Sequence, residues 1–146
     1  MVENITLLKS IGRASKVLEN HFNERIAAHE LNLTRVQFIA LKVISLEEYT
    51  SQNKVAFITS RDKSSLVRLL NTLEKKGFIT RSPSPDDKRV NLLKITGTGR
   101  KELEKVAPVI REVEQHVTEG LNQNDINTTI RVLSQVFEKV KPENFV

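Results

Sequence analysis

The sequence pattern changes at Gly77, and this change limits the possible folds more than any other feature of the chain. Before Gly77, leucines recur at helical spacing; after it, two short apolar runs flank a polar loop at 82–89. Basic residues followed by glycine are typical of a helix end, and a loop with proline and aspartate between short apolar runs is typical of a β-hairpin. We therefore predict a helix at about 60–76 and strands at 78–81 and 90–95.

Two helices are predicted just before this unit. Thr34 followed by Gln37 is a capping-box pattern, so a helix should begin at Thr34 and end near Glu47. Its buried side should contain Phe38, Leu41 and residues 43–46. A short helix is expected at 51–58, where the inward-facing residues should be Val55, Ala56 and Ile58. The order helix, helix, strand, loop, strand describes a helix-turn-helix followed by a β-hairpin, which is a winged helix.

Longer helices are predicted towards both ends of the chain. Apolar residues recur at steps of three and four from Ile5 to His29, from about residue 99 to 117, and from residue 124 or 125 to 140. Pro108 lies inside the second of these helices, and we expect it to kink the helix or mark a restart, because proline has no N–H to donate. The chain is thus expected to be mainly α-helical, in the α+β class, with a two-stranded β-hairpin as its wing.

The end helices carry more apolar surface than a winged-helix core can cover. A winged-helix core formed by residues 33–96 needs only part of that surface. Two copies of the chain could bury the remainder together, which predicts a homodimer whose dimerisation layer is built from residues 1–32 and 97–146. The alternative is that these helices fold back on their own chain.

Positive charge is concentrated in the middle of the chain. The 146 residues carry a net charge of +5, but residues 51–100 hold 11 basic and 4 acidic residues, a net charge of +7. A local positive field of this kind suits a polyanion such as DNA or RNA. The alternative is a solvated lysine-rich face that only aids solubility.

Several functions are excluded by residue types or patterns that the chain lacks. Without cysteine it cannot form a disulfide, a cysteine-ligated metal site or a thiol redox switch. It has neither a Gly-rich phosphate loop nor a spaced His, Asp and Ser set, so we expect no enzyme activity and no cofactor. No apolar stretch reaches the roughly 20 residues of a membrane span, and no signal-peptide pattern is present, so we expect a soluble cytoplasmic protein without a membrane partner.

The second helix of a helix-turn-helix enters the major groove of DNA, so its outward face carries the candidate contacts. Without the buried leucines, that face consists of Lys63, Ser64, Ser65, Val67, Arg68, Asn71, Thr72 and Lys75. Arg68 can form two hydrogen bonds with guanine, the hydroxyl groups can bind phosphates or base edges, and Val67 can pack on a thymine methyl group. The alternative for any one of these residues is an ordinary solvated helix face.

The hairpin loop is a second candidate surface. Lys88 and Arg89 lie at its tip, after two prolines that stiffen the approach, and a basic side chain there can enter the minor groove. Asp87 could pair with a basic neighbour and hold it in one pose, which reduces the conformational freedom lost on binding. The alternative is that residues 86–88 are only a turn sequence.

Taken together, these residues resemble the MarR (multiple antibiotic resistance regulator) family of winged-helix transcription regulators over nearly the full length of the chain. The likeness rests on Leu33-Thr34, Gln37-Phe38 and Leu41, on residues 62–65 and 73–79, and on residues 87–89 followed by 93–96 and Gly99. The last of these pieces, Asp-x-Arg before Leu-x-Ile-Thr-x-x-Gly, is the most specific.

The resemblance implies a homodimeric repressor that binds a pseudo-palindromic DNA operator. Each recognition helix would lie in a major groove with Ser64, Ser65 and Arg68 at contact positions, and Arg89 would reach the minor groove with Asp87 orienting it. In many relatives a small anionic, often aromatic, effector binds between the dimerisation helices and the DNA-binding lobe and releases the DNA. A polar residue is common at the position of Val67 in this family, so the base preference there is expected to differ.

Two side chains of the first predicted helix are candidates for binding such an effector. His21 and Arg25 are four residues apart, so they share a helix face, and either cation could meet a carboxylate. The alternative is that both are surface or interface residues. The other two histidines each have one possible acidic partner, and two ligands without a third do not make a metal site, so no metal is expected.

A winged helix can also serve as a protein-interaction module, with its basic middle facing an acidic partner. Such a module needs neither a dimer nor a specific DNA sequence. We expect operator binding, and the interaction module is the alternative.

Overall fold

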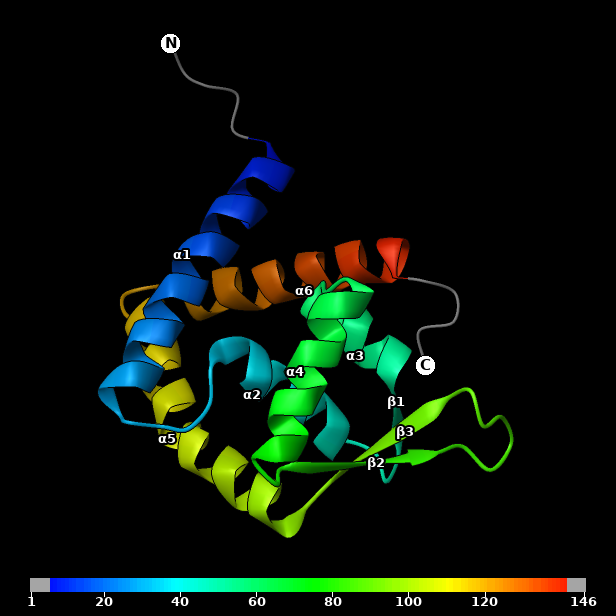
Figure 1. Ribbon diagram of the computed structural model, residues 1–146. Coiled ribbons are helices and arrows are strands. Elements are labelled where there is room, and N and C mark those ends of the chain that lie inside the picture. Colours follow the sequence, from blue (N-terminus) through cyan, green and yellow to red (C-terminus); the bar gives the residue numbers. More distant parts are fainter. Residues whose placement is uncertain (1–5, 142–146) are drawn as a thin grey trace. The chain divides into compact units, whose positions relative to one another are not determined.

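The elements follow the predicted helix-turn-helix and hairpin in order, which confirms the winged helix (Figure 1). The computed structural model describes residues 6–141. Its elements are α1 (Leu7–Ala28), α2 (Arg35–Ser45), β1 (Thr50–Ser51), α3 (Gln52–Thr59), α4 (Lys63–Lys75), β2 (Ile79–Pro83), β3 (Asn91–Ile95), α5 (Gly97–Thr118) and α6 (Gln123–Val140). The predicted helix start at Ile5 and the outer ends of the two predicted dimerisation segments lie outside the described residues.

The chain forms two compact units, and the division between them falls inside α5. Residues up to Val113 form the first unit, and residues from Glu114 onward form the second. The helix-turn-helix and the hairpin both belong to the first unit. The sequence analysis divides the chain by role: a winged-helix core at 33–96 and a dimerisation layer at 1–32 and 97–146. These roles do not coincide with the two compact units, and the division by role stays a prediction.

The sheet has three antiparallel strands in the order β1-β3-β2. β2 and β3 pair from Ile79 opposite Ile95 to Pro83 opposite Asn91, which confirms the predicted hairpin. β1 is a third strand that the pattern did not predict, with Thr50 opposite Leu93. Two residues are too few to show the alternation that marks a strand. The sheet therefore joins the start of α3 to the wing.

Side-chain caps determine where α2 and α3 begin. Thr34 Oγ1 accepts a hydrogen bond from the N–H of Gln37 at 3.3 Å, and Gln37 Oε1 accepts one from the N–H of Thr34 at 3.1 Å. This is the predicted capping box at the start of α2. The Ser51 side chain caps α3 by accepting a hydrogen bond from the N–H of Lys54, so this helix begins one residue later than expected.

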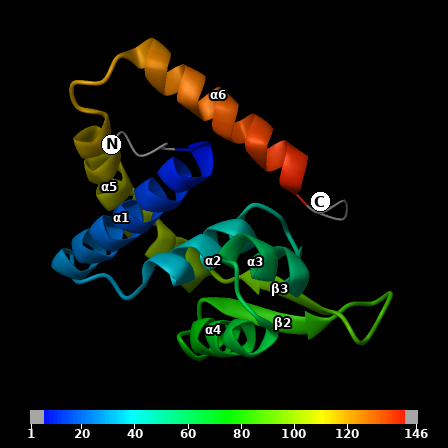
Figure 2. The same ribbon diagram turned by 90° about the horizontal axis from the view of Figure 1, so that it is seen from above.

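The hydrophobic core lies where α2, α3, α4 and α5 pack on the sheet (Figure 2). Fully buried side chains from these elements include Leu41, Ile44, Val55, Leu70, Leu73, Leu93 and Val106. The prediction that Leu46 is buried is wrong, because its side chain is 67% exposed. It follows the last residue of α2 and stands two residues after Ile44, which turns it about 200° away from the buried face of the helix.

The apolar faces of α1 and α6 are largely exposed in the described structure. α1 has one buried residue, Ile26, whereas Leu8 is 76% exposed, and α6 has no buried residue. α5 continues through Pro108, so the predicted alternative of a helix restart does not occur. None of the helices within residues 6–141 combines the length and apolar composition that a membrane span requires.

Candidate nucleic-acid interface

α4 begins at an acidic cap that organises its first turn. Asp62 accepts hydrogen bonds from the N–H of Ser65 at 2.8 Å and from its hydroxyl at 3.2 Å. The backbone hydrogen bond from Ser65 is the main reason that the pKa of Asp62 lies below its ordinary value. The carboxylate is therefore ionised at neutral pH, and Lys63 and Ser64 beside it are exposed to solvent.

The same network continues to the principal base-reading candidate, Arg68. Arg68 Nη2 donates a hydrogen bond to Ser65 Oγ at 3.2 Å, and the hydroxyl of Thr72 donates to the backbone carbonyl of Arg68 at 2.9 Å. Ser65 and Thr72 are half-buried, whereas Arg68 is exposed and Val67 is 41% exposed. Arg68 is thus held by its own helix while its guanidinium stays accessible to a ligand.

The C-terminal half of α4 contacts a side chain that the sequence analysis missed. Arg81 lies on β2, where its Nε donates a hydrogen bond to Glu74 Oε2 at 2.5 Å and its Nη2 donates to Asn71 Oδ1 at 2.6 Å. These charge-assisted contacts join the recognition helix to the wing strand. A signal was present in the sequence, because Arg81 is two residues after the buried Ile79 and so shares its face of the strand, where a cation needs a partner.

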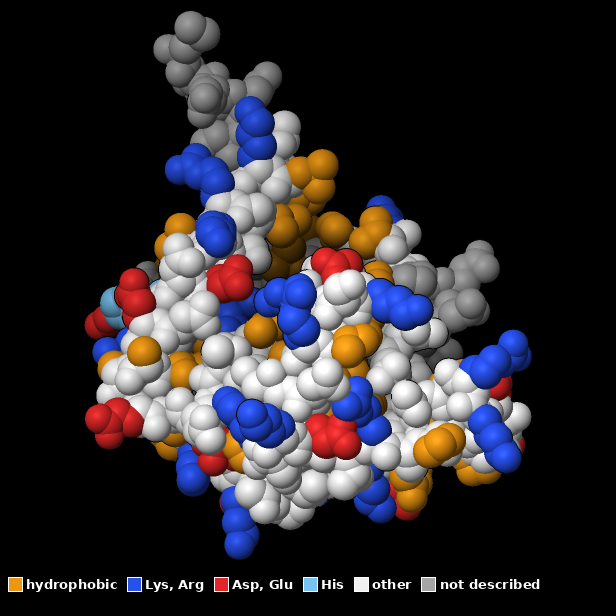
Figure 3. Space-filling model, in the orientation of Figure 1, with side chains coloured by type: hydrophobic (Ala, Val, Ile, Leu, Met, Phe, Trp, Pro, Cys, Tyr) orange, Lys and Arg blue, Asp and Glu red, His pale blue; other side chains and the backbone are white. Residues whose placement is uncertain are grey.

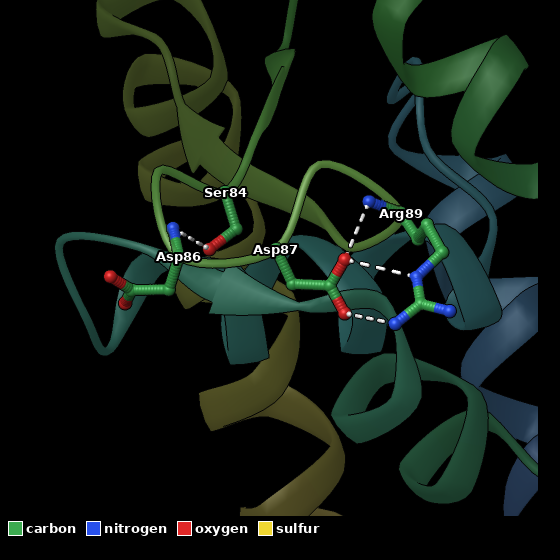
Figure 4. A network of polar contacts seen from close by, with 4 residues as sticks. All are labelled: Ser84, Asp86, Asp87 and Arg89. Atoms are coloured by element: carbon green, nitrogen blue, oxygen red, sulfur yellow. Dashed lines mark hydrogen bonds and ion pairs between the residues drawn. The ribbon is translucent and has the colours of Figure 1, made fainter.

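At the end of the hairpin, Asp87 and Arg89 form an ion pair (Figure 4). The Asp87 carboxylate accepts hydrogen bonds from the backbone N–H of Arg89 at 3.0 Å, from its Nε at 3.2 Å and from its Nη2 at 3.4 Å. The backbone hydrogen bond is the main reason that the pKa of Asp87 lies below its ordinary value. The Arg89 side chain is nevertheless 90% exposed. The orienting role of Asp87 towards DNA stays a prediction.

The exposed candidate side chains come from α4 and from the hairpin loop. Figure 3 shows Lys and Arg side chains over α4 and over the free end of the hairpin. We call this set the basic face, and it consists of Lys63, Ser64, Val67, Arg68, Asn71, Lys88 and Arg89. Phosphate groups of a nucleic acid are attracted to such a surface without regard to base sequence.

One of the two effector candidates on α1, Arg25, contacts an acidic residue of α5. Arg25 forms an ion pair with Glu112, and His29 Nε2 lies 2.9 Å from Glu112 Oε2. The hydrogen bond with His29 is the main reason that the pKa of Glu112 lies below its ordinary value. The charge of Arg25 is therefore offset within the chain, and His21 is half-buried. Effector binding by His21 and Arg25 stays a prediction.

Comparison with known proteins relates this chain to helix-turn-helix regulators. Residues 33–90 match the family model described as MarR family. The chain is 36% identical over 93 residues to YdcH of Bacillus subtilis, an uncharacterised HTH-type transcriptional regulator, and the match covers 61% of this chain and 63% of YdcH. The chain thus spans less than two thirds of that relative. YybA, a second B. subtilis protein described in the same words, is 28% identical over 139 residues, 92% of this chain and 89% of YybA.

A solved structure resembles the chain over almost its full length. The apo form of wild-type MarR from E. coli superposes with a TM-score of 0.79 at 28% sequence identity, and the likeness covers 92% of this chain and 98% of that chain. The family model matches the segment that holds α2, α4 and the Asp87–Arg89 pair. Over residues 33–90 the chain therefore matches the MarR family model, and over most of its length it resembles a solved MarR structure.

Proposed function

We propose that this protein is a sequence-specific DNA-binding transcription regulator that represses from a pseudo-palindromic operator. The observation that carries the proposal is that α4 and the hairpin each hold an arginine, Arg68 and Arg89, by a side-chain contact and still expose it to solvent. An arginine held near one pose loses little conformational freedom on binding, and arginine is the commonest reader of guanine. The names of YdcH and YybA as transcriptional regulators support the same role.

The proposed regulator acts as a homodimer. Ile130, Leu133 and Val140 recur on one side of α6 and are 58%, 40% and 72% exposed. A monomer rarely leaves an apolar stripe of this kind uncovered. A twofold pairing of two copies would bury it, and a twofold protein matches the symmetry of a pseudo-palindromic operator.

Release from DNA by a small anionic or aromatic effector is the regulatory part of the proposal. The first unit contains a pocket of about 290 Å³ whose lining includes Ser15, Glu19, Arg35, Thr59 and Arg61. Arg35 Nη1 lies 3.9 Å from Glu19 Oε1, which is too long for a hydrogen bond, so the guanidinium can still bind a carboxylate. We therefore favour this pocket for the effector over the neutralised Arg25.

A selection from duplex DNA with a randomised core tests the proposed function. We expect the full-length protein to enrich an inverted repeat, which we call the selected duplex. Its affinity, measured by fluorescence anisotropy, should fall by about 10³- to 10⁵-fold between 50 and 200 mM salt, as for a protein that contacts roughly 6–10 phosphates. Arg68→Ala should relax the base preference at one position in each half-site.

The same selection, together with sedimentation, distinguishes the proposed regulator from a protein-interaction module. Failure to enrich any sequence, combined with a monomer in sedimentation, would contradict a DNA-binding regulator. Those two results together would favour a protein-interaction module with an acidic partner.

A further inference from the structure

Arg81 bridges two side chains of the recognition helix from the neighbouring strand. It bonds Asn71 Oδ1 at 2.6 Å and Glu74 Oε2 at 2.5 Å through different nitrogens. Asn71 and Glu74 are three residues apart, so they lie one turn apart on the same side of α4. The Arg81 side chain is 25% exposed, against 90% for Arg89, so it is partly buried against the structure, whereas Arg89 extends into solvent.

The contact with Arg81 fixes which end of the Asn71 amide is available. A guanidinium can only donate hydrogen bonds, so the amide atom that faces it must be the oxygen, and the NH₂ group is directed elsewhere. Asn71 is exposed and stands four residues after Val67, one turn further along the basic face. An asparagine that rotates freely can read adenine with its oxygen and nitrogen together. Held in this way, Asn71 offers DNA a donor, which suits guanine O6 and N7 or thymine O4.

The contact with Arg81 also offsets a charge that opposes DNA binding. Glu74 is the acidic residue of α4, and its side chain is 42% exposed. A carboxylate on a helix that approaches DNA repels the phosphates, and an ion pair with a partly buried guanidinium reduces that repulsion.

We propose that Arg81 is a positioning residue for operator recognition, which fixes Asn71 as a hydrogen-bond donor and offsets the charge of Glu74. The proposal rests on the proposed DNA-binding function and adds to it a residue of the wing strand that controls base preference at the recognition helix. The two effects are separable, because charge changes the affinity for any DNA, whereas the orientation of Asn71 changes the preference for one base pair.

Full-length variants separate these effects on three probes: the selected duplex, its single base-pair changes and a scrambled duplex. Arg81→Met leaves Glu74 unpaired and Asn71 free to rotate, so binding to every duplex should weaken by about 10-fold and the base preference at one position per half-site should be lost. Adding Glu74→Gln removes the unpaired carboxylate. The affinity for scrambled DNA should then return to within about 2-fold of the parent, while the base preference stays relaxed.

Two further variants control for charge and folding. Arg81→Lys keeps the positive charge, but a single ammonium does not hold both partners in the planar geometry of a guanidinium, so the affinity should be kept and the preference relaxed. Lys94→Gln removes a cation from β3, opposite Thr80, without touching the Arg81 contacts, so it should leave the base preference unchanged. Thermal unfolding of each variant identifies any that misfolds.

The outcomes distinguish this inference from the proposed function. If the parent enriches no sequence, both are overturned. If it enriches an operator but Arg81→Met and Arg81→Lys keep the parent's base preference, the inference alone is overturned. It is overturned as well if Lys94→Gln relaxes the same base position, because the effect would then follow charge rather than the orientation of Asn71.

Discussion

Gly99 determines how closely the start of α5 can approach the connection between α4 and β2. A Cβ at this position would lie 2.3 Å from the backbone oxygen of Phe78 and 2.9 Å from Ile95 Cγ1. The Phe78 oxygen belongs to the backbone, so it cannot rotate away. Beside it, Thr96 Oγ1 accepts a hydrogen bond from the N–H of Gly99 at 3.0 Å and donates one to the carbonyl of Gly77 at 2.6 Å. This close junction requires glycine.

Replacing Gly99 by alanine should therefore destabilise the protein. We expect Gly99→Ala to lower the free energy of unfolding by about 1–3 kcal/mol, because the backbone must shift to admit the methyl group. Gly97→Ala is the matched control, since a Cβ there meets nothing within 4 Å. Chemical denaturation measures both variants, and equal effects would contradict the close approach at Gly99.

Arg89 should contribute to DNA binding without contributing to stability. Its side chain is 90% exposed and its ion pair lies in a loop, so Arg89→Ala should leave the melting temperature unchanged. Affinity for the selected duplex should fall by about 10-fold, with a shallower salt dependence. Arg111→Ala, on the exposed surface of α5, is the control. Equal losses in anisotropy titrations of the two variants would contradict a specific role for the wing.

Asp87→Asn tests whether the pose of Arg89 matters. The substitution raises the net charge by one, which by itself strengthens binding to DNA. It also removes the ion pair that holds the guanidinium. We expect weaker binding of the selected duplex, because the loss of a fixed pose outweighs the gain in charge. Tighter binding in the same titration would show that Asp87 acts only as a charge.

At the scale of elements, α1 and α5 are joined by the contacts of Glu112 with Arg25 and His29. The pKa of Glu112 is held below its ordinary value of 4.5, mainly by the hydrogen bond with His29. A carboxyl group whose pKa is lowered by folding stabilises the folded state above its unfolded pKa and loses that effect as the pH falls through the folded pKa. The contact between these helices should therefore weaken in acid.

Glu112→Gln should make stability less dependent on acidic pH. We expect the parent to be more stable than the variant at neutral pH, and the two to converge below about pH 4.5 as Glu112 is protonated. Glu104→Gln, which changes an exposed glutamate of the same helix, should follow the parent curve. Parallel curves for the parent and Glu112→Gln, from urea unfolding at each pH, would contradict this role of the ion pair.

Elements whose signals are local could be predicted from the sequence. Each of these signals is built from residues that are close together in the sequence: the Thr34 capping box, the leucines of α4 and the glycine at its end. The helices that they mark form as expected. β1 was missed because it exists only by pairing with β3, far away in the sequence. The restart considered at Pro108 was wrong because propensity at one residue is overridden by the packing of a long helix, with Val106 and Val109 buried on either side.

At the scale of the whole molecule, the candidate site also combines local contacts, which the sequence predicts, with tertiary contacts, which it does not. The Asp87–Arg89 pair joins residues two apart, and the Asp62–Ser65–Arg68 network lies within two helical turns, so both could be anticipated from spacing. The Arg81 contacts and the Arg25–Glu112 pair depend on tertiary structure, which sequence spacing does not report.

The proposed homodimer depends on the exposed apolar face of α6. Ile130→Glu with Leu133→Glu places two charges on that face, so sedimentation should show a monomer, and affinity for the selected duplex should fall because one half-site is lost. Gln135→Glu is the control, because at 100° per residue it lies on the opposite side of the helix. A double variant that sediments as the parent does would contradict a dimer interface on α6.

Hydroxyl-radical footprinting of the parent protein on the selected duplex tests the central claim most directly. The account predicts two protected segments related by twofold symmetry, with centres about 10 base pairs apart or a multiple of that distance, as for two recognition helices in successive major grooves. Arg89→Ala should remove the protection that flanks each of the two segments and leave the protection within each segment in place. A single protected segment, or uniform protection along the duplex, would contradict sequence-specific binding by a dimer.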